Sequence, residues 1–181
     1  MVQSIELLLD DDGDAAVRAS WAALAEAGLP SLADHTGATN APHVTVAVTE
    51  GTGFAAAADA LRAVFGGWSL SGGGLAASVG APVLFGGHRG RWVVARQIVP
   101  SRPLLTLHAA VHRSLRLHAP GAEVLAQTAP DGWTPHVTLA ARMPGDRLGE
   151  ALAAVDLEPV PVRFRAARLW DSVERAVTPL A

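Results

Sequence analysis

One short sequence occurs twice in this chain, once in each half. Residues 41–47 read Ala-Pro-His-Val-Thr-Val-Ala, and residues 134–140 read Thr-Pro-His-Val-Thr-Leu-Ala. In both copies apolar and polar side chains alternate, which is typical of a β-strand that buries one face. The repeat therefore predicts a duplicated fold to which each half contributes an equivalent strand.

Strand geometry assigns the side chains of each copy to two faces, because successive side chains of a strand alternate. The buried face is expected to hold Val44, Val46, Val48, Val137, Leu139 and Ala141. The opposite face is expected to hold His43, Thr45, Ala47, His136, Thr138 and Ala140. Each copy thus presents an imidazole and a hydroxyl whose α-carbons lie about 7 Å apart, two strand rises along the chain. One such pair is explained by ordinary strand chemistry, but two matched pairs, each preceded by proline, indicate a site.

The missing residue types exclude several classes of enzyme. All 14 basic side chains are arginine, and the chain has no cysteine and no tyrosine. Without lysine there is neither a lysyl-nucleotide intermediate nor a Walker-type phosphate loop. Without cysteine and tyrosine there are no thiol nucleophiles, disulfides, cysteine-ligated zinc sites or tyrosyl phosphodiesterases. Histidine is left as the best-placed catalytic side chain.

Composition also bounds the architecture and the partners. Half of the 181 residues are hydrophobic, which is typical of a globular protein with a sizeable core. We expect residues 1–181 to form one bilobal domain, with motif strands at about 43–48 and 136–141. The first residues lack the features of a signal peptide and no apolar stretch is long enough to span a bilayer, so we expect a cytoplasmic protein. The net charge of −3 argues against binding that relies on bulk electrostatic attraction to nucleic acid.

The N-terminal residues predict a strand followed by a helix. Ile5, Leu7 and Leu9 alternate with polar residues, as in a strand with one buried face. Glu6 has two interpretations: its carboxylate reaches a pocket on the other face, or it pairs with an arginine at the rim of the sheet, which is the favoured reading. The acidic run at 10–14 predicts a helix start, because its glycine comes too early for a calcium-binding loop.

Four segments carry apolar side chains at helical spacing. The stripes are Val17, Trp21 and Leu24; Phe54, Ala58, Leu61 and Phe65 after a cap at Thr52; Leu104, His108, Val111 and Leu115 after Ser101 and Pro103; and Leu148, Ala151, Leu152 and Val155. Residues 68–99 are punctuated by glycine and predict strands joined by tight turns. Residues 160–166 predict a last alternating strand, with Arg163 and Arg165 opposite its apolar side.

His108 and His112 on the third of these helices have the spacing of a zinc-binding pair. No glutamate follows His108, and no cysteine exists to complete a site. We therefore favour buried or half-buried helix histidines with hydrogen-bond partners.

Duplication has a geometric consequence for the two motifs. If two similar lobes pack about a pseudo-twofold axis, the equivalent strands meet at the centre and their polar faces share one cleft. Two imidazoles and two hydroxyls suit phosphodiester chemistry, since one neutral imidazole can accept a proton while a protonated one donates. Threonine hydroxyls can hold the phosphoryl oxygens, so this chemistry needs no metal.

The two His-Val-Thr motifs and the duplicated strand-helix layout resemble the two-histidine (2H) phosphoesterase superfamily, and most of all its bacterial 2'-5' RNA ligase or RNA 2',3'-cyclic phosphodiesterase group. The resemblance implies a bilobal α+β fold with antiparallel-rich sheets lining a central groove and helices outside. It implies cleavage, or reversible ligation, of cyclic or 2'-5' phosphodiesters without metal or cofactor. His43 and His136 would be catalytic, and Thr45 and Thr138 would hold the phosphate.

Two further residues are candidates for substrate binding. Members of the RNA ligase type often carry arginine five places after the second motif histidine, a place held here by Ala141, and Arg142 follows. Regular alternation puts Arg142 on the face of His136, whereas a strand bulge would displace it. Trp133 is placed to stack a base, although core packing is the usual role of tryptophan. We expect a monomer acting on a small nucleotide or short RNA, and the alternative is a non-catalytic module that binds the same ligands.

Overall fold

A computed structural model of the protein describes residues 2–68 and 70–181. Within these residues, seven strands form one sheet, and every pair of neighbouring strands is antiparallel. The strand order is β1-β2-β5-β4-β3-β6-β7, and β1 also pairs with β6. The elements are β1 Val2–Leu9, α1 Asp11–Glu26, β2 His43–Glu50, α2 Ala58–Gly66, β3 Leu75–Gly86, β4 Arg91–Ile98, α3 Arg102–His118, β5 His136–Pro144, α4 Leu148–Ala154, β6 Val160–Asp171 and β7 Ala176–Pro179.

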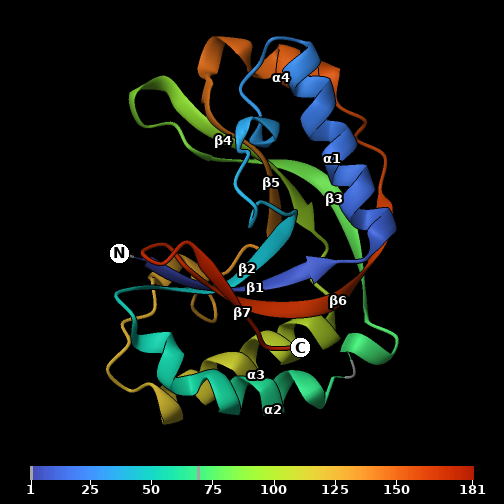
Figure 1. Ribbon diagram of the computed structural model, residues 1–181. Helices are drawn as coiled ribbons and strands as arrows, with labels where there is room; N and C mark the ends of the chain where they lie inside the picture. The colour runs from blue at the N-terminus through green and yellow to red at the C-terminus, as the bar shows by residue number, and fades with distance from the viewer. Residues whose placement is uncertain (1, 69) are drawn as a thin grey trace.

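The sheet divides into two equivalent lobes. One lobe contains β2, β1, the second part of β6 and β7; the other contains β5, β4, β3 and the first part of β6. Helices α2 and α3 cover the outer face of the first lobe, and α1 and α4 lie against the second (Figure 1). This mixed α+β, bilobal arrangement confirms the predicted fold class.

Local sequence signals place the helices. The Asp10 side chain accepts a hydrogen bond from the Gly13 amide and so caps α1, while Val17, Trp21 and Leu24 are buried as expected. Ser101 caps α3 in the same way through the Leu104 amide. The predicted cap at Thr52 is wrong: its side chain makes no capping bond, and a 3₁₀ turn at Gly53–Ala57 precedes α2.

Both motif strands contain a bulge at the same motif position. Glu6 of β1 pairs with Thr45 and Ile5 pairs with Ala47, so Val46 is the extra residue of a bulge in β2. Ala95 of β4 pairs with Thr138 and Val94 pairs with Ala140, so Leu139 is the extra residue of the matching bulge in β5. A bulge adds one residue to a strand and reverses the phase of its alternation beyond that point.

The bulges correct part of the predicted face assignment. Ala47 and Ala140 were expected on the polar face, but both are fully buried. Val48 and Ala141 were expected inside, but Val48 is half-buried and Ala141 is exposed. The assignment holds for the residues before each bulge, which include both histidines and both threonines.

The rest of the chain follows the prediction with extensions at its end. The glycine-rich middle forms the β3–β4 hairpin, whose turn contains Gly86 and Gly87, each with φ of 90°. The last strand runs on to Asp171, and β7 pairs with it as a further short strand. Among the described residues, no helix is both long and apolar enough to cross a bilayer.

Candidate active site

The two motif strands meet at one rung of the sheet, where Val44 pairs with Val137 in antiparallel register. Both valines follow their motif histidine, and both point into the core. Antiparallel pairing at this rung sets His43 beside Thr138 and Thr45 beside His136. These four side chains share the face opposite the valines, and all four residues are half-buried.

The two histidine rings are held in the same way. Nδ1 of His43 donates to the Ala41 carbonyl at 2.8 Å, and Nδ1 of His136 donates to the Thr134 carbonyl at 2.8 Å. Each acceptor belongs to the residue before the motif proline. A proton fixed on Nδ1 leaves Nε2 of a neutral ring with a free lone pair. Both rings therefore have Nε2 available for proton transfer.

The surroundings of the two rings differ. Nε2 of His43 lies 3.6 Å from a carboxylate oxygen of Glu6. The His136 ring instead packs on Phe85, with 4.4 Å between ring centroids. Burial lowers the pKa of His136 and a charge on His43 lowers it further, while the bond to the Thr134 carbonyl opposes them. His136 is therefore suited to be neutral at physiological pH.

Glu6 combines the two interpretations drawn from the sequence. It is 3% exposed, and its carboxylate accepts from Nε of Arg168 at 2.7 Å and from the Ser4 hydroxyl at 2.6 Å. It thus pairs with an arginine, as favoured, and at the same time reaches the motif face through His43. Arg168, which the sequence analysis did not single out, also donates to the Thr39 carbonyl at 2.9 Å.

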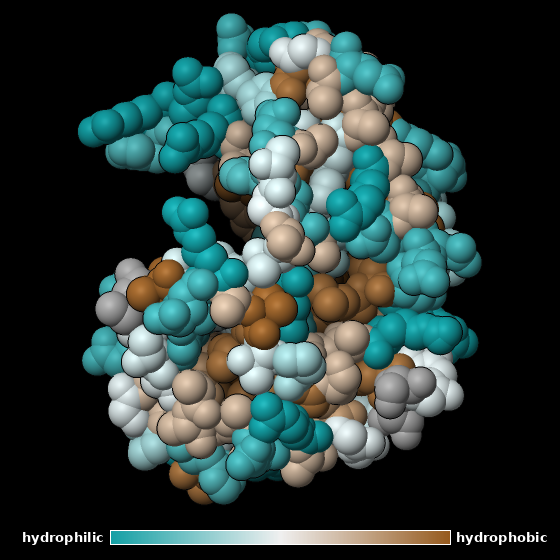
Figure 2. Space-filling view, in the orientation of Figure 1, coloured by the Kyte–Doolittle hydropathy of each residue, from teal (hydrophilic) through white to brown (hydrophobic). Residues whose placement is uncertain are grey.

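A cleft of about 750 Å³ opens beside the first motif. Figure 2 shows the molecule hollowed between the two lobes. The polar or aromatic side chains that line the cleft come from β1, β2, β6, the loop before β2 and the turn between β6 and β7: Ser4, Glu6, His35, Thr39, Asn40, His43, Thr45, Arg168, Trp170, Ser172 and Arg175. Its size and mostly polar lining suit a small polar ligand.

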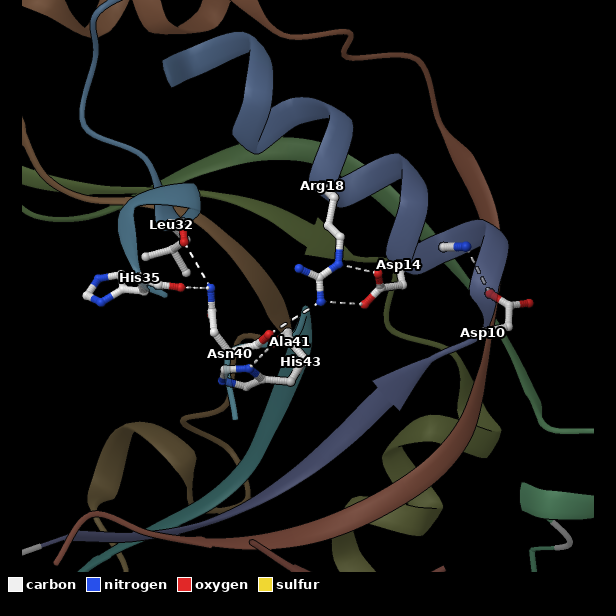
Figure 3. Close-up of polar contacts among 9 residues, drawn as sticks. Asp10, Asp14, Arg18, Leu32, His35, Asn40, Ala41 and His43 are labelled. Carbon is white, nitrogen blue, oxygen red and sulfur yellow. Dashed lines mark hydrogen bonds and ion pairs between the residues drawn. The ribbon is translucent and has the colours of Figure 1, made fainter. Parts of the chain in front are cut away.

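The loop that borders this cleft is tied to the protein by its own polar contacts (Figure 3). The Asn40 side chain donates to the carbonyls of Leu32 and His35 at 3.0 and 2.7 Å. Arg18 on α1 pairs with Asp14 and donates to the Asn40 carbonyl. These contacts fix the chain immediately before His43.

Two indole groups form hydrogen bonds to the backbone of the motif strands. Nε1 of Trp21 donates to the Thr138 carbonyl, and Nε1 of Trp133 donates to the Thr45 carbonyl, both at 2.9 Å. The two acceptors occupy the same place in the two motifs, immediately before each bulge. Trp133 was a candidate either for stacking a base or for core packing; its N–H is bonded here, and its ring stacks on His108 with 4.0 Å between the ring centroids.

The structure does not keep Arg142 in regular strand geometry. Arg142 has φ of 59° and is exposed, and its carbonyl accepts a hydrogen bond from Arg91. A second irregularity in the pairing of β4 with β5, between Ala140 and Met143, spans Arg142, so the regular alternation that assigned it to the face of His136 does not extend to this position.

His108 and His112 lie in the core under the first lobe, 4% and 3% exposed. Nε2 of His108 donates to the Thr128 carbonyl and Nε2 of His112 donates to the Val46 carbonyl. Burial lowers the pKa of His112 and lowers that of His108 to about 4. The burial and hydrogen bonds of both rings confirm the favoured reading. Among the described residues, no group of three or more His, Cys, Asp or Glu side chains is placed to hold a metal ion.

Comparisons with known proteins identify a family from the sequence and similar folds among solved structures. A family model described as 2'-5' RNA ligase superfamily matches residues 11–175. Kluyveromyces marxianus Usb1 has a similar structure, with a TM-score of 0.57 and 12% identity over 99% of this chain and 97% of that one. The same protein solved with uridine monophosphate gives a TM-score of 0.56 at 12% identity over 99% and 97% of the two chains. The MHV ns2 PDE domain gives a TM-score of 0.58 at 16% identity over 99% of both chains. No curated protein sequence matches the chain.

Proposed function

Because the chain belongs to the 2'-5' RNA ligase superfamily, whose members are two-histidine phosphoesterases, we propose that it is a metal-independent phosphodiesterase. Its substrates would be 2',3'-cyclic or 2'-5' phosphodiesters of nucleotides or RNA ends, which it hydrolyses or, in the reverse direction, ligates. The observation that carries the proposal is the pairing of Val44 with Val137, which places the two motif histidines on one face with matched Nδ1 bonds.

Hydrolysis of a cyclic phosphate requires two proton transfers at opposite sides of the phosphorus. Nε2 of one histidine removes a proton from water as the water oxygen bonds to phosphorus. Nε2 of the other donates a proton to the ribose oxygen as the phosphorus–oxygen bond breaks. The product is a nucleoside monophosphate. The histidine that acted as base is now protonated and the other is neutral, and proton exchange with water restores their initial states. The chain therefore supplies both proton steps itself.

Thr45 and Thr138 would hold the non-bridging oxygens. Each hydroxyl lies across the strand pair from the histidine of the other motif, so the four groups share one face of the sheet. Hydroxyl donors aimed at phosphoryl oxygens stabilise the charge that develops as the bond to water forms. They also keep the phosphorus in line with the two imidazoles.

Small ligands fit this site better than long nucleic acids. The net charge is −3, and the cleft of about 750 Å³ is bordered by the tied loop before β2. The similar structure of Usb1 solved with uridine monophosphate supports a nucleotide as the ligand class. Trp170 and Arg175, which line the cleft, are available for a base and a phosphate.

The test is a substrate panel of 2',3'-cyclic nucleotides, 2'-5' dinucleotides and RNA oligomers ending in a cyclic phosphate. Products are separated by chromatography, with and without a chelator. We expect turnover of at least one class and the same rate after chelation. Ligand binding without turnover of any class would favour the alternative, a nucleotide or RNA-end binding module on the same scaffold.

A further inference from the structure

We propose that Glu6 divides the labour of the two histidines, making His43 the proton donor to the leaving oxygen and His136 the base that activates water. The inference rests on the proposed function and assigns the two proton steps that the duplicated motifs leave equivalent. Glu6 acts here as a positioning residue, because it touches His43 and not the reacting atoms.

The first support is the geometry of the carboxylate. Glu6 Oε1 lies 3.6 Å from Nε2 of His43, the ring nitrogen that is not bonded to the Ala41 carbonyl. Oε2 is bonded to Arg168 and Oε1 to the Ser4 hydroxyl, so the carboxylate is fixed from two strands and hidden from solvent. A fixed anion at this distance favours the imidazolium form of a histidine.

The second support is that the duplication does not repeat this carboxylate. Glu6 is the residue of β1 that pairs with Thr45 at the bulge. The residue of β4 that pairs with Thr138 at the matching bulge is Ala95. The position that supplies an anion to His43 therefore supplies only a buried methyl group near His136. Paired titratable groups in unlike environments take opposite proton roles.

The arginines around this contact have partners of their own. Arg168 on β6 is engaged by Glu6 and Thr39, and Arg18 on α1 is engaged by Asp14 and Asn40. His136 on β5 faces His43, and its burial and packing on Phe85 favour its neutral form. His35 from the loop before β2 and Arg175 after β6 line the same cleft. Glu6 is the carboxylate in contact with either motif histidine among the described residues.

The experiment compares the pH dependence of cyclic nucleotide turnover in wild type and Glu6→Gln. The amide keeps the shape and can still accept from Arg168, but it removes the charge beside His43. We expect the limb on which activity falls with rising pH to move down by about one pH unit, with about a tenfold loss at the alkaline end. The limb on the acidic side, set by His136, should not move.

Two variants serve as controls. Glu6→Asp keeps the charge and should keep the alkaline limb closer to wild type. Glu150→Gln makes the same change in an exposed glutamate of α4 that pairs with Arg147, and should leave both limbs in place. Thermal melting of each variant separates a loss of folding from a loss of proton donation.

A second measurement does not depend on turnover. The His43 ring is titrated by NMR in wild type and in Glu6→Gln, and the proposal predicts that the variant ring loses its proton at lower pH. An unchanged His43 titration, or a shift of the acidic limb instead, would overturn the role of Glu6. If wild type turned over no substrate, the proposed function would fail while the NMR titration still reported on Glu6 and His43.

Discussion

Val44 and Val137 pair directly across the boundary between the two lobes, and each is the residue that follows its motif histidine. This rung converts a repeat in the sequence into a shared site, because His43 then neighbours Thr138 and His136 neighbours Thr45. Both valines are buried, so the sheet that joins the lobes is anchored in the core directly beneath the polar groups.

The motif threonines provide the first prediction. Thr45→Val and Thr138→Val keep the shape and β-branching of the side chain and remove only the hydroxyl. We expect each change to lower kcat by about 10² to 10³, because the hydroxyl donates to charge that grows in the transition state. Thr106→Val, at an exposed position on α3, is the matched control and should leave kcat unchanged. Wild-type kcat in both motif variants would contradict the assignment.

The indoles behind the motif strands provide the second prediction. Trp21→Phe and Trp133→Phe remove the donors to the Thr138 and Thr45 carbonyls. We expect each to lower the free energy of unfolding by about 1–3 kcal/mol, since a carbonyl is left without its partner. Turnover should also fall, because the strand before each bulge loses its support. Denaturant titration and kcat measure the two effects, and stability equal to wild type in both variants would rule out the support.

The buried histidine of α3 provides the third prediction, on stability against pH. Burial lowers the pKa of His108 from 6.5 to about 4 in the folded protein. Between these values the unfolded chain binds a proton that the folded chain does not, so stability falls as pH falls from 6.5 to 4. The loss is about 3 kcal/mol over this window. It should be seen in denaturant titrations at pH 7.5, 5.5 and 4.5.

His108→Gln provides the control for this prediction. Residue 108 of the variant cannot bind a proton in this window, so the stability of the variant should depend less steeply on pH than that of wild type, whatever its absolute stability. An equal slope in the two proteins would place the acid sensitivity elsewhere in the chain.

Much of this architecture was predictable because its signals are local and repeated. Alternation defined the motif strands, and a capping aspartate with a buried stripe defined α1. The matched motifs themselves predicted that His43 and His136 would share one face. The rung that joins them is a long-range contact, yet the duplication predicted it because equivalent strands of a pseudo-twofold fold meet at the axis.

The bulges are what alternation was unable to predict. They depend on how β1 and β4 pair with the motif strands, a relationship that the motif sequence alone does not contain. Beyond them Val48 is half-buried and Ala141 is exposed, and a further irregularity between Ala140 and Met143 interrupts the alternation that placed Arg142. Likewise, Arg168 lies far from Glu6 in sequence, so only the folded sheet shows that the carboxylate contacts both an arginine and His43.

The proposed catalysis depends most on the two histidines acting as one unit. The measurement is the rate of 2',3'-cyclic nucleotide hydrolysis by wild type, His43→Ala, His136→Ala and the double variant, with exposed His118→Ala as the control. We predict that each motif variant loses about 10² to 10⁴ in rate, that the double variant loses little more, and that the control matches wild type. A single motif variant that turns over substrate at the wild-type rate would contradict paired catalysis by His43 and His136.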